Sequence, residues 1–222
     1  MTSPCWSRPA ALVPLLCASL TALAPGGAAV QLLPGAVKEL AAGKLLVAAR
    51  GLPDPNFFET VILLAEHSGE GAMGLVVNRR TDVSIARLFP NLAQGQGRPS
   101  ALYAGGPVAA DGVVALLRST APRSDGRRVL DDLYMVANRE GLQGLISQGA
   151  DQSRFRVYLG YAGWGPGQLE RETTQGAWHV FRADTGVVFD PDPDSLWQRQ
   201  VRRTEDRMVL APPVALRPVP LP

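Results

Sequence analysis

Apolar residues in this chain form short runs and alternations that are typical of β-strands. Nearly continuous β-branched and apolar runs predict buried strands, and a regular alternation predicts strands with one buried face. The strands expected on this basis cover residues 44–49, 60–67, 72–78, 101–104, 113–118, 133–137, 154–159 and 178–182. A glycine-containing turn at 68–71 separates the second strand from the third, so these two are expected to pair as an antiparallel hairpin.

Helices are expected at four places between and after these strands. A short helix is expected to begin at Thr81 or Ser84, to run through 88–89 and to end before Pro90. A second follows Asn138, with apolar residues at 142, 145 and 146 on one face. Another begins at Gln168. The last begins at Asp190 or Asp192, before Pro193, and runs to residue 203. The polar stretch 119–128 and the segment 94–99 are expected to be loops.

The first 29 residues have the three parts of a secretory signal peptide. Arg8 supplies the positive charge, residues 9–24 form the apolar run, and small residues at 27–29 precede a cleavage site that makes Val30 the new N-terminus. The apolar run is too short for a comfortable transmembrane span, which takes about 20 residues. We therefore expect an exported protein, periplasmic or secreted, with no stable membrane span after cleavage. A cytoplasmic location is the alternative.

The rest of the chain is expected to divide into three parts. These are a lead-in segment at 30–43, one domain at 44–204 and a Pro-rich tail at 205–222. The tail has no hydrophobic periodicity, which is typical of disorder.

Charge and cysteine content exclude several classes of function. The net charge is +2, and no clustered basic face is evident, which argues against nucleic acid as a partner. Cys5 and Cys17 both lie in the expected signal peptide, so the mature protein has no thiol for a disulfide, a metal site or a nucleophile. His67 and His179 are not spaced as a metal-binding pair. No metal and no cofactor are expected.

An ordered set of motifs between residues 44 and 203 resembles the AlgH/YqgE family of bacterial proteins. The motifs are GLPDPNF at 51–57, TVILLAEH at 60–67, GAMGLVVNR at 71–79, GGPV at 105–108 and GYAGWGPGQLE at 160–170, followed by Trp178 and Trp197. The resemblance implies an α+β fold in which a mixed, strongly bent β-sheet forms a pseudo-barrel with helices packed on it. It implies no settled activity, although the family carries the label of a transcriptional regulator.

The chain departs from that family's pattern in two ways. Family members usually lack a signal segment, and a proline often stands where this chain has Arg80. The signal segment has the larger consequence, because an exported protein cannot regulate transcription by touching DNA.

Glycines and aromatic residues are concentrated at 158–170, and this concentration has two interpretations. One is a ligand pocket at the end of the sheet, because glycines allow close backbone approach and rings can stack on a flat ligand. The pocket would be lined by Tyr161, Trp164, Gln168, Asn78, Arg79, His67, Gly105 and Gly106. The other interpretation, which we favour, is structural: the glycines serve tight turns and the rings fill the end of the barrel.

Few residues are candidates for acid–base chemistry or charge recognition. His67 with Glu66, and the pair Asp131 and Asp132, could transfer protons, but structural hydrogen bonding or simple exposure is the expected role of each. The sequence has no Gly-x-Ser-x-Gly motif and no phosphate-binding loop. No catalytic residue is therefore assigned. Arginines at 199, 202 and 203 could meet an acidic partner, although a solvated helix face is the default.

Three functional hypotheses follow from these observations. The favoured one is an exported, non-enzymatic protein that binds an unidentified protein or small molecule. The second is an enzyme with a pocket at 160–168. The third is a cytosolic, transcription-linked regulator, which would require a basic surface and a cytosolic location.

Overall fold

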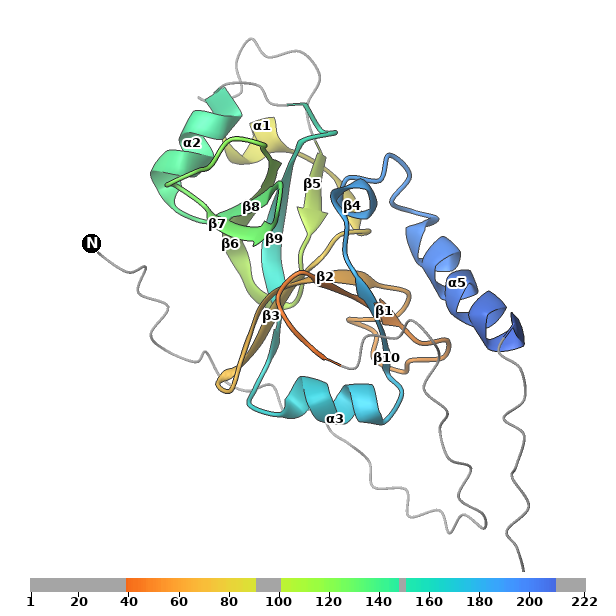
Figure 1. Ribbon diagram of the computed structural model, residues 1–222. Coiled ribbons are helices and arrows are strands. Elements are labelled where there is room, and N and C mark those ends of the chain that lie inside the picture. Colours follow the sequence, from red (N-terminus) through yellow and green to blue (C-terminus); the bar gives the residue numbers. More distant parts are fainter. Residues whose placement is uncertain (1–38, 91–100, 148–150, 211–222) are drawn as a thin grey trace, which may run out of the picture. The chain divides into compact units, whose positions relative to one another are not determined.

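Ten strands and five helices are present in residues 39–90, 101–147 and 151–210, the part of the chain that the computed structural model describes (Figure 1). All of these residues belong to the unit Leu33–Pro222. The elements are β1 (Lys44–Ala48), β2 (Val61–Ser68), β3 (Gly71–Val76), β4 (Arg80–Ser84), α1 (Ile85–Leu88), β5 (Ala101–Ala104), β6 (Val108–Arg118), β7 (Arg127–Leu130), β8 (Leu133–Val136), α2 (Arg139–Ser147), β9 (Phe155–Trp164), α3 (Gln168–Thr174), β10 (Trp178–Arg182), α4 (Thr185–Val188) and α5 (Leu196–Leu210). None of these helices is long and apolar enough to cross a membrane.

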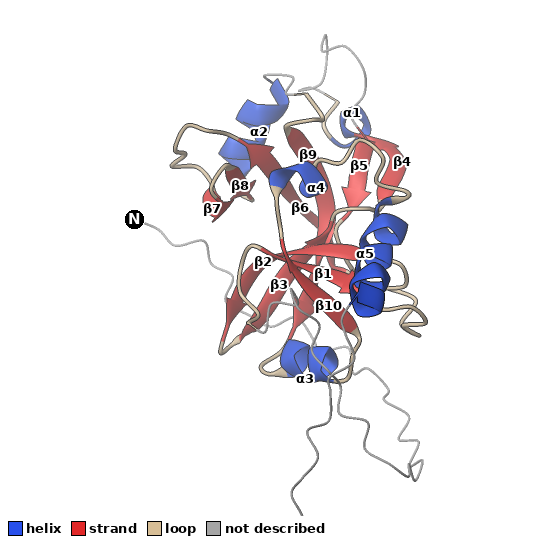
Figure 2. Ribbon diagram, turned by 45° about the vertical axis from the view of Figure 1, so that its right-hand side comes forward, coloured by secondary structure: helices blue, strands red, loops and turns tan. Residues whose placement is uncertain are grey.

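The strands form one strongly curled sheet, which confirms the predicted α+β fold class (Figures 1 and 2). The strand order is β10-β1-β2-β3-β9-β6-β8-β7, and β4 joins through β5, which pairs with β9. Every pair is antiparallel except β5 with β9, which makes the sheet mixed. The expected hairpin is present as β2 and β3, with Ser68 opposite Gly71 and a bulge between Leu64 and Glu66.

Strand β9 changes partner in the middle of its length. Its first half lies between β5 and β6, where Val157 and Leu159 pair with both neighbours. Its last three residues, from Ala162 on, pair with β3 instead. The change occurs at Gly160, which has a φ of +66° and lies against the backbone of Gly106.

Glycines are required at this crossing because two backbones touch there. A Cβ on Gly105 would overlap the carbonyl oxygen of Gly160, and one on Gly106 would overlap the backbone of Tyr161. The crossing is also fixed by hydrogen bonds from Gly105 N to Leu159 O, at 2.7 Å, and from Val76 N to Gly105 O, at 2.9 Å. The segment between β5 and β6 is thereby fastened to both β9 and the end of β3.

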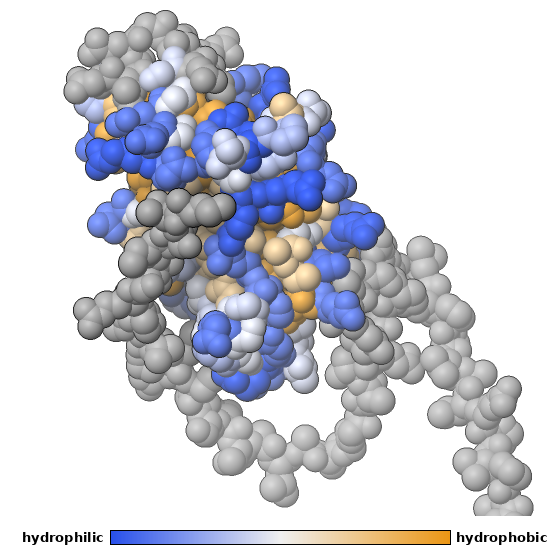
Figure 3. All heavy atoms as spheres, turned by 60° about the vertical axis from the view of Figure 1, so that its left-hand side comes forward, coloured by the Kyte–Doolittle hydropathy of each residue, from blue (hydrophilic) through white to orange (hydrophobic). Residues whose placement is uncertain are grey.

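Two hydrophobic clusters lie on opposite sides of the shared strands. In β9, Phe155 and Val157 pack with α2 in the smaller cluster, whereas Tyr158, Ala162 and Trp164 belong to the larger one. Alternate side chains of a strand point to opposite faces, so the strand supplies both clusters at once. On the surface, hydrophilic side chains cover most of the face in Figure 3, and apolar atoms show between them in separate patches.

A buried arginine on β9 holds the segment between α4 and α5. The guanidinium of Arg156 donates to the carbonyl oxygens of Val188, at 2.9 Å, and Asp190, at 2.5 Å. It also lies over the rings of Tyr103, at 4.7 Å from the centroid, and Phe189. A charge this deeply buried is tolerated only with such partners, so Arg156 ties the C-terminal segment to the sheet.

Short polar elements and helix ends are where the structure differs from the sequence-based expectations. Strand β7 occupies the end of the expected 119–128 loop, β6 starts five residues before the expected strand, and β4 and α4 were not predicted. Helix α5 continues to Leu210, so the prediction of a tail from residue 205 is wrong for 205–210. The expected signal peptide, residues 30–38, the 94–99 loop and residues 211–222 lie outside the described residues.

Replacing Gly160 by alanine is expected to lower the free energy of unfolding by at least about 2 kcal/mol. Its Cβ would face the carbonyl oxygens of Gly106 and Val108, in a backbone conformation that alanine disfavours. Urea unfolding followed by tryptophan fluorescence measures the change. Gly144→Ala is the control, because Gly144 lies in α2 with open space around it, and alanine favours a helix by about 0.5–1 kcal/mol. Similar losses in both variants would contradict the role of the crossing.

Candidate functional site

Three aromatic rings close the end of the sheet at which β3, β9 and β10 meet α3. Trp164 stacks on Phe57 at a centroid distance of 5.9 Å and an angle of 16°. Trp178 packs edge-on against both, at 6.0 Å from Trp164 and 5.7 Å from Phe57. All three side chains are buried. Trp164 therefore packs on the protein's own rings, as the structural interpretation of the 158–170 stretch expects.

Glu172 on α3 accepts hydrogen bonds from two of these rings. Its Oε2 accepts from Trp164 Nε1 and from Trp178 Nε1, both at 2.9 Å. Its Oε1 accepts from Gln168 Nε2 at 2.8 Å, and Gln168 Oε1 in turn accepts from Gly165 N at 3.1 Å. The carboxylate thus joins α3 to β9 and β10. Sequence reasoning missed Glu172, although its spacing of four residues from Gln168 on a helix was a signal.

His67 lies beside this cluster and bonds to the same helix. Its Nε2 is 2.7 Å from Oε1 of Glu170, a side chain about half exposed. The pKa of Glu170 is lowered by a hydrogen bond from its own backbone amide and then by the bond from His67. Glu66 points the other way and pairs with Arg127. The predicted proton-transfer pair of Glu66 and His67 is therefore split between opposite faces of β2.

Asn78 and Arg79 hold the loop between β1 and β2, which we call the 50–59 loop. Asn78 Oδ1 accepts from Val61 N at 2.8 Å, and its Nδ2 donates to Glu59 O at 3.0 Å. Arg79 donates to the carbonyl oxygens of Asn56, at 2.6 Å, and Phe58, at 3.2 Å. Burial lowers the pKa of Arg79, and the charge of Asp54 opposes this effect. Both residues face the loop from beneath.

Two neighbouring phenylalanines of the 50–59 loop point in opposite directions. Phe57 enters the aromatic cluster, while 51% of Phe58 is exposed. The amides of both donate to Asp54 O, at 3.0 and 2.8 Å, and Thr60 Oγ1 donates to Phe57 O at 2.8 Å. Glu59 completes the turn with a φ of +53°, which is unusual for a residue other than glycine. The exposed ring of Phe58 was not singled out from the sequence.

The predicted pocket residues therefore fall in three places. Gly105, Gly106 and the half-buried Tyr161 lie at the backbone crossing. Gln168 is the first residue of α3, and Trp164 and His67 bond to side chains of the same helix. Asn78 and Arg79 lie under the 50–59 loop. Other predicted candidates are engaged elsewhere: Asp132 accepts from Arg118 and Thr185, and Arg199 pairs with Asp190 and Asp192.

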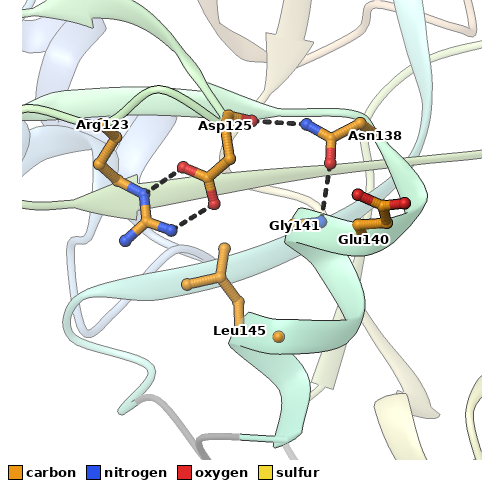
Figure 4. A pocket seen from close by; sticks show the side chains of 7 residues that line it. Arg123, Asp125, Asn138, Glu140, Gly141 and Leu145 are labelled. Atoms are coloured by element: carbon orange, nitrogen blue, oxygen red, sulfur yellow. Dashed lines mark hydrogen bonds and ion pairs between the residues drawn. The ribbon is translucent and has the colours of Figure 1, made fainter.

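Two hollows of the described surface are not lined by these residues. One, of about 280 Å³, is at the start of α2, and a second, of about 240 Å³, lies along β4. In the first, Arg123 pairs with Asp125 at 2.8 and 2.5 Å, and Asn138 bonds to Asp125 O and Gly141 N (Figure 4). The Arg123 bond lowers the pKa of Asp125. The polar groups there satisfy one another. In the described ranges, no three His, Cys, Asp or Glu side chains are placed to hold a metal ion.

Replacing Glu172 by alanine is expected to lower the free energy of unfolding by about 2–4 kcal/mol, because two indole N–H groups lose their acceptor. Glu170→Ala is the matched control on the same helix, and its exposed pair with His67 should contribute less than about 1 kcal/mol. Urea unfolding followed by near-ultraviolet circular dichroism reports on the tryptophans. If Glu172→Ala were no less stable than Glu170→Ala, the carboxylate would not be the anchor of α3.

Comparison with known proteins identifies the family. The sequence profile of the family described as AlgH-like matches residues 45–208. The chain is 37% identical over 174 residues to a UPF0301 protein of Streptomyces avermitilis, which covers 76% of this chain and 89% of the relative. It is 40% identical over 155 residues to a UPF0301 protein of Azoarcus sp., and the match covers 67% of this chain and 81% of that relative.

Two solved structures share the fold at 30% sequence identity. Protein DIP2367 from Corynebacterium diphtheriae matches with a TM-score of 0.64 over 74% of this chain and 87% of that one. The AlgH protein from Pseudomonas aeruginosa matches with a TM-score of 0.59 over 77% of this chain and 89% of that one. The motifs, the fold and these similarities agree, and the chain belongs to the AlgH-like family.

Proposed function

We propose that this protein is an exported, non-enzymatic interaction protein whose contact surface is the 50–59 loop with the exposed ring of Phe58. The observation that carries the proposal is the exposure of Phe58 on a loop whose backbone Asn78 and Arg79 hold by hydrogen bonds. An exposed aromatic ring offers a large apolar area to a partner, and aromatic residues contribute much of the energy at protein interfaces.

The rigidity of the loop favours binding over a merely structural role. Ordering a flexible side chain at an interface costs about 0.5–1.5 kcal/mol, and a loop already held in place avoids much of this cost. Arg79 and Asn78 bond to the carbonyl oxygens of residues 56, 58 and 59, so the backbone on either side of Phe58 is fixed. A positive φ at a residue such as Glu59 also persists only where the surroundings impose it.

The exposed pair of Arg50 and Glu205 extends this surface. The ring of Phe58 lies 6.5 Å from that of Trp197 on α5, which is buried, and Arg50 lies over Trp197. Arginine is among the residues that contribute most of the energy at protein interfaces. A protein partner fits this surface better than a small molecule, because the ring stands out from the protein.

Export rests on the sequence of residues 1–29. We expect the mature protein to begin at Val30 and to be recovered outside the cytoplasm. Cell fractionation with N-terminal sequencing measures both, and Leu15→Arg, which interrupts the apolar run, should leave the full chain in the cytoplasm. A native protein that begins at Met1 and is found in the cytoplasm would overturn export and favour an intracellular role.

A photo-crosslinking amino acid at position 58 is expected to form a covalent adduct with one partner protein in the native compartment. The same amino acid at position 88 is the control, because Leu88 is the other large apolar residue that is exposed in the described part of the chain. Mass spectrometry identifies the adducts. Equal adducts at both positions, or none at position 58, would count against the 50–59 loop as the contact surface.

A further inference from the structure

We propose that residues 211–222 of the chain dock on the exposed face of Phe58 and so compete with the partner for the 50–59 loop. This inference rests on the proposed function and adds its regulation. Three properties support it: the place from which the segment departs, its length, and its composition.

Helix α5 connects the Phe58 surface to this segment. Trp197, in the first turn of α5, is the ring that packs against Phe58, and Glu205 further along α5 bonds to Arg50, at the start of the 50–59 loop. The loop and the helix therefore form one continuous surface. The chain leaves this surface at Leu210, the last residue of α5.

The segment is long enough to return to Phe58. The distance from Trp197 to Leu210 along the helix axis is about 20 Å, at 1.5 Å per residue. Residues 211–222 in an extended polyproline conformation would span about 37 Å, at 3.1 Å per residue. The segment can thus pass back along α5 and lie across the ring.

The composition of the segment suits an exposed aromatic ring. It contains five prolines, at 212, 213, 218, 220 and 222. Proline-rich segments are already extended, lose little entropy on docking, and are bound by aromatic side chains. Lacking amide protons at these positions, the segment is poorly suited to pairing with a strand edge.

Attachment to α5 makes a weak contact sufficient. A short tether gives an effective concentration of about 1 mM, so a Kd of about 0.3 mM for the free segment would keep about three quarters of the molecules docked. A partner that binds Phe58 more tightly than this would displace the segment.

Fluorine NMR of protein labelled with 4-fluorophenylalanine tests the docking. The relaxation of the Phe58 signal by a soluble gadolinium chelate is compared between the full chain and a chain that ends at Leu210. The shortened chain is expected to show about fourfold faster relaxation at Phe58, since its ring is no longer covered. The buried ring of Phe57 is the internal control and should not change, and Phe58→Leu assigns the signal.

A synthetic peptide of residues 211–222 should restore the protection when added to the shortened chain at millimolar concentration. A peptide with its prolines replaced by serine should not. Equal relaxation of Phe58 in the full and shortened chains would overturn the proposal. Protection that depends on protein concentration, with a doubled mass in light scattering, would also overturn it, because a second copy would then cover the ring.

The two proposals can fail separately. If the relaxation at Phe58 is unchanged but the crosslinker at position 58 still captures one partner, the docking of 211–222 is wrong and the interaction surface stands. If the relaxation changes but no partner is captured, the segment covers a surface that has no such role.

Discussion

The contact between two stretches of backbone, Gly105–Gly106 and Gly160–Tyr161, is the constraint on which this fold depends. Because no side chain separates the two stretches, β9 can leave the side of β5 and continue beside β3. The sheet must bend where this happens. Hydrogen bonds from Gly105 to both β9 and β3 then hold the bend. The second half of β9 ends at Trp164, and the aromatic cluster, α3 and the support of the 50–59 loop are built from there.

Hydrophobic patterning predicted the parts of the fold whose burial is continuous. Strand β2 and strand β3 are runs of buried residues, and their hairpin, as well as the helix after Asn138, could be predicted from the sequence. Strand β7 was missed because none of its four residues is fully buried, whereas the equally short β5 and β8 are runs of mostly buried residues. Helix α4 was missed because its sequence, TGVV, consists of residues that do not favour a helix. The end of α5 was misplaced because residues 202–207 of the helix are polar or charged and give no apolar periodicity. The bend of the sheet was predicted only by the family resemblance, since the spacing of the glycines does not show which two stretches of backbone come into contact.

Much less of the candidate site could be predicted, because its contacts join residues that are far apart in the sequence. The glycine and aromatic residues at 158–170 were recognised as unusual, but their partners include Phe57 and Trp178. Asn78 and Arg79 were predicted as lining of a pocket at the 158–170 stretch, and nothing in their spacing shows that they face the 50–59 loop. Above all, the sequence places two identical side chains next to each other at 57 and 58. Only the fixed backbone determines which one is exposed.

That arrangement has an evolutionary consequence. The shape of the 50–59 loop is maintained by backbone carbonyl and amide groups, which bond to Asn78, Arg79 and Asp54 O whatever side chain stands at position 58. The interior needs a ring at position 57, whereas the fold places no comparable demand on its neighbour. Position 58 can therefore change its chemistry by single substitutions with a smaller loss of stability than position 57, and a lineage could acquire a new partner while the scaffold beneath stays the same.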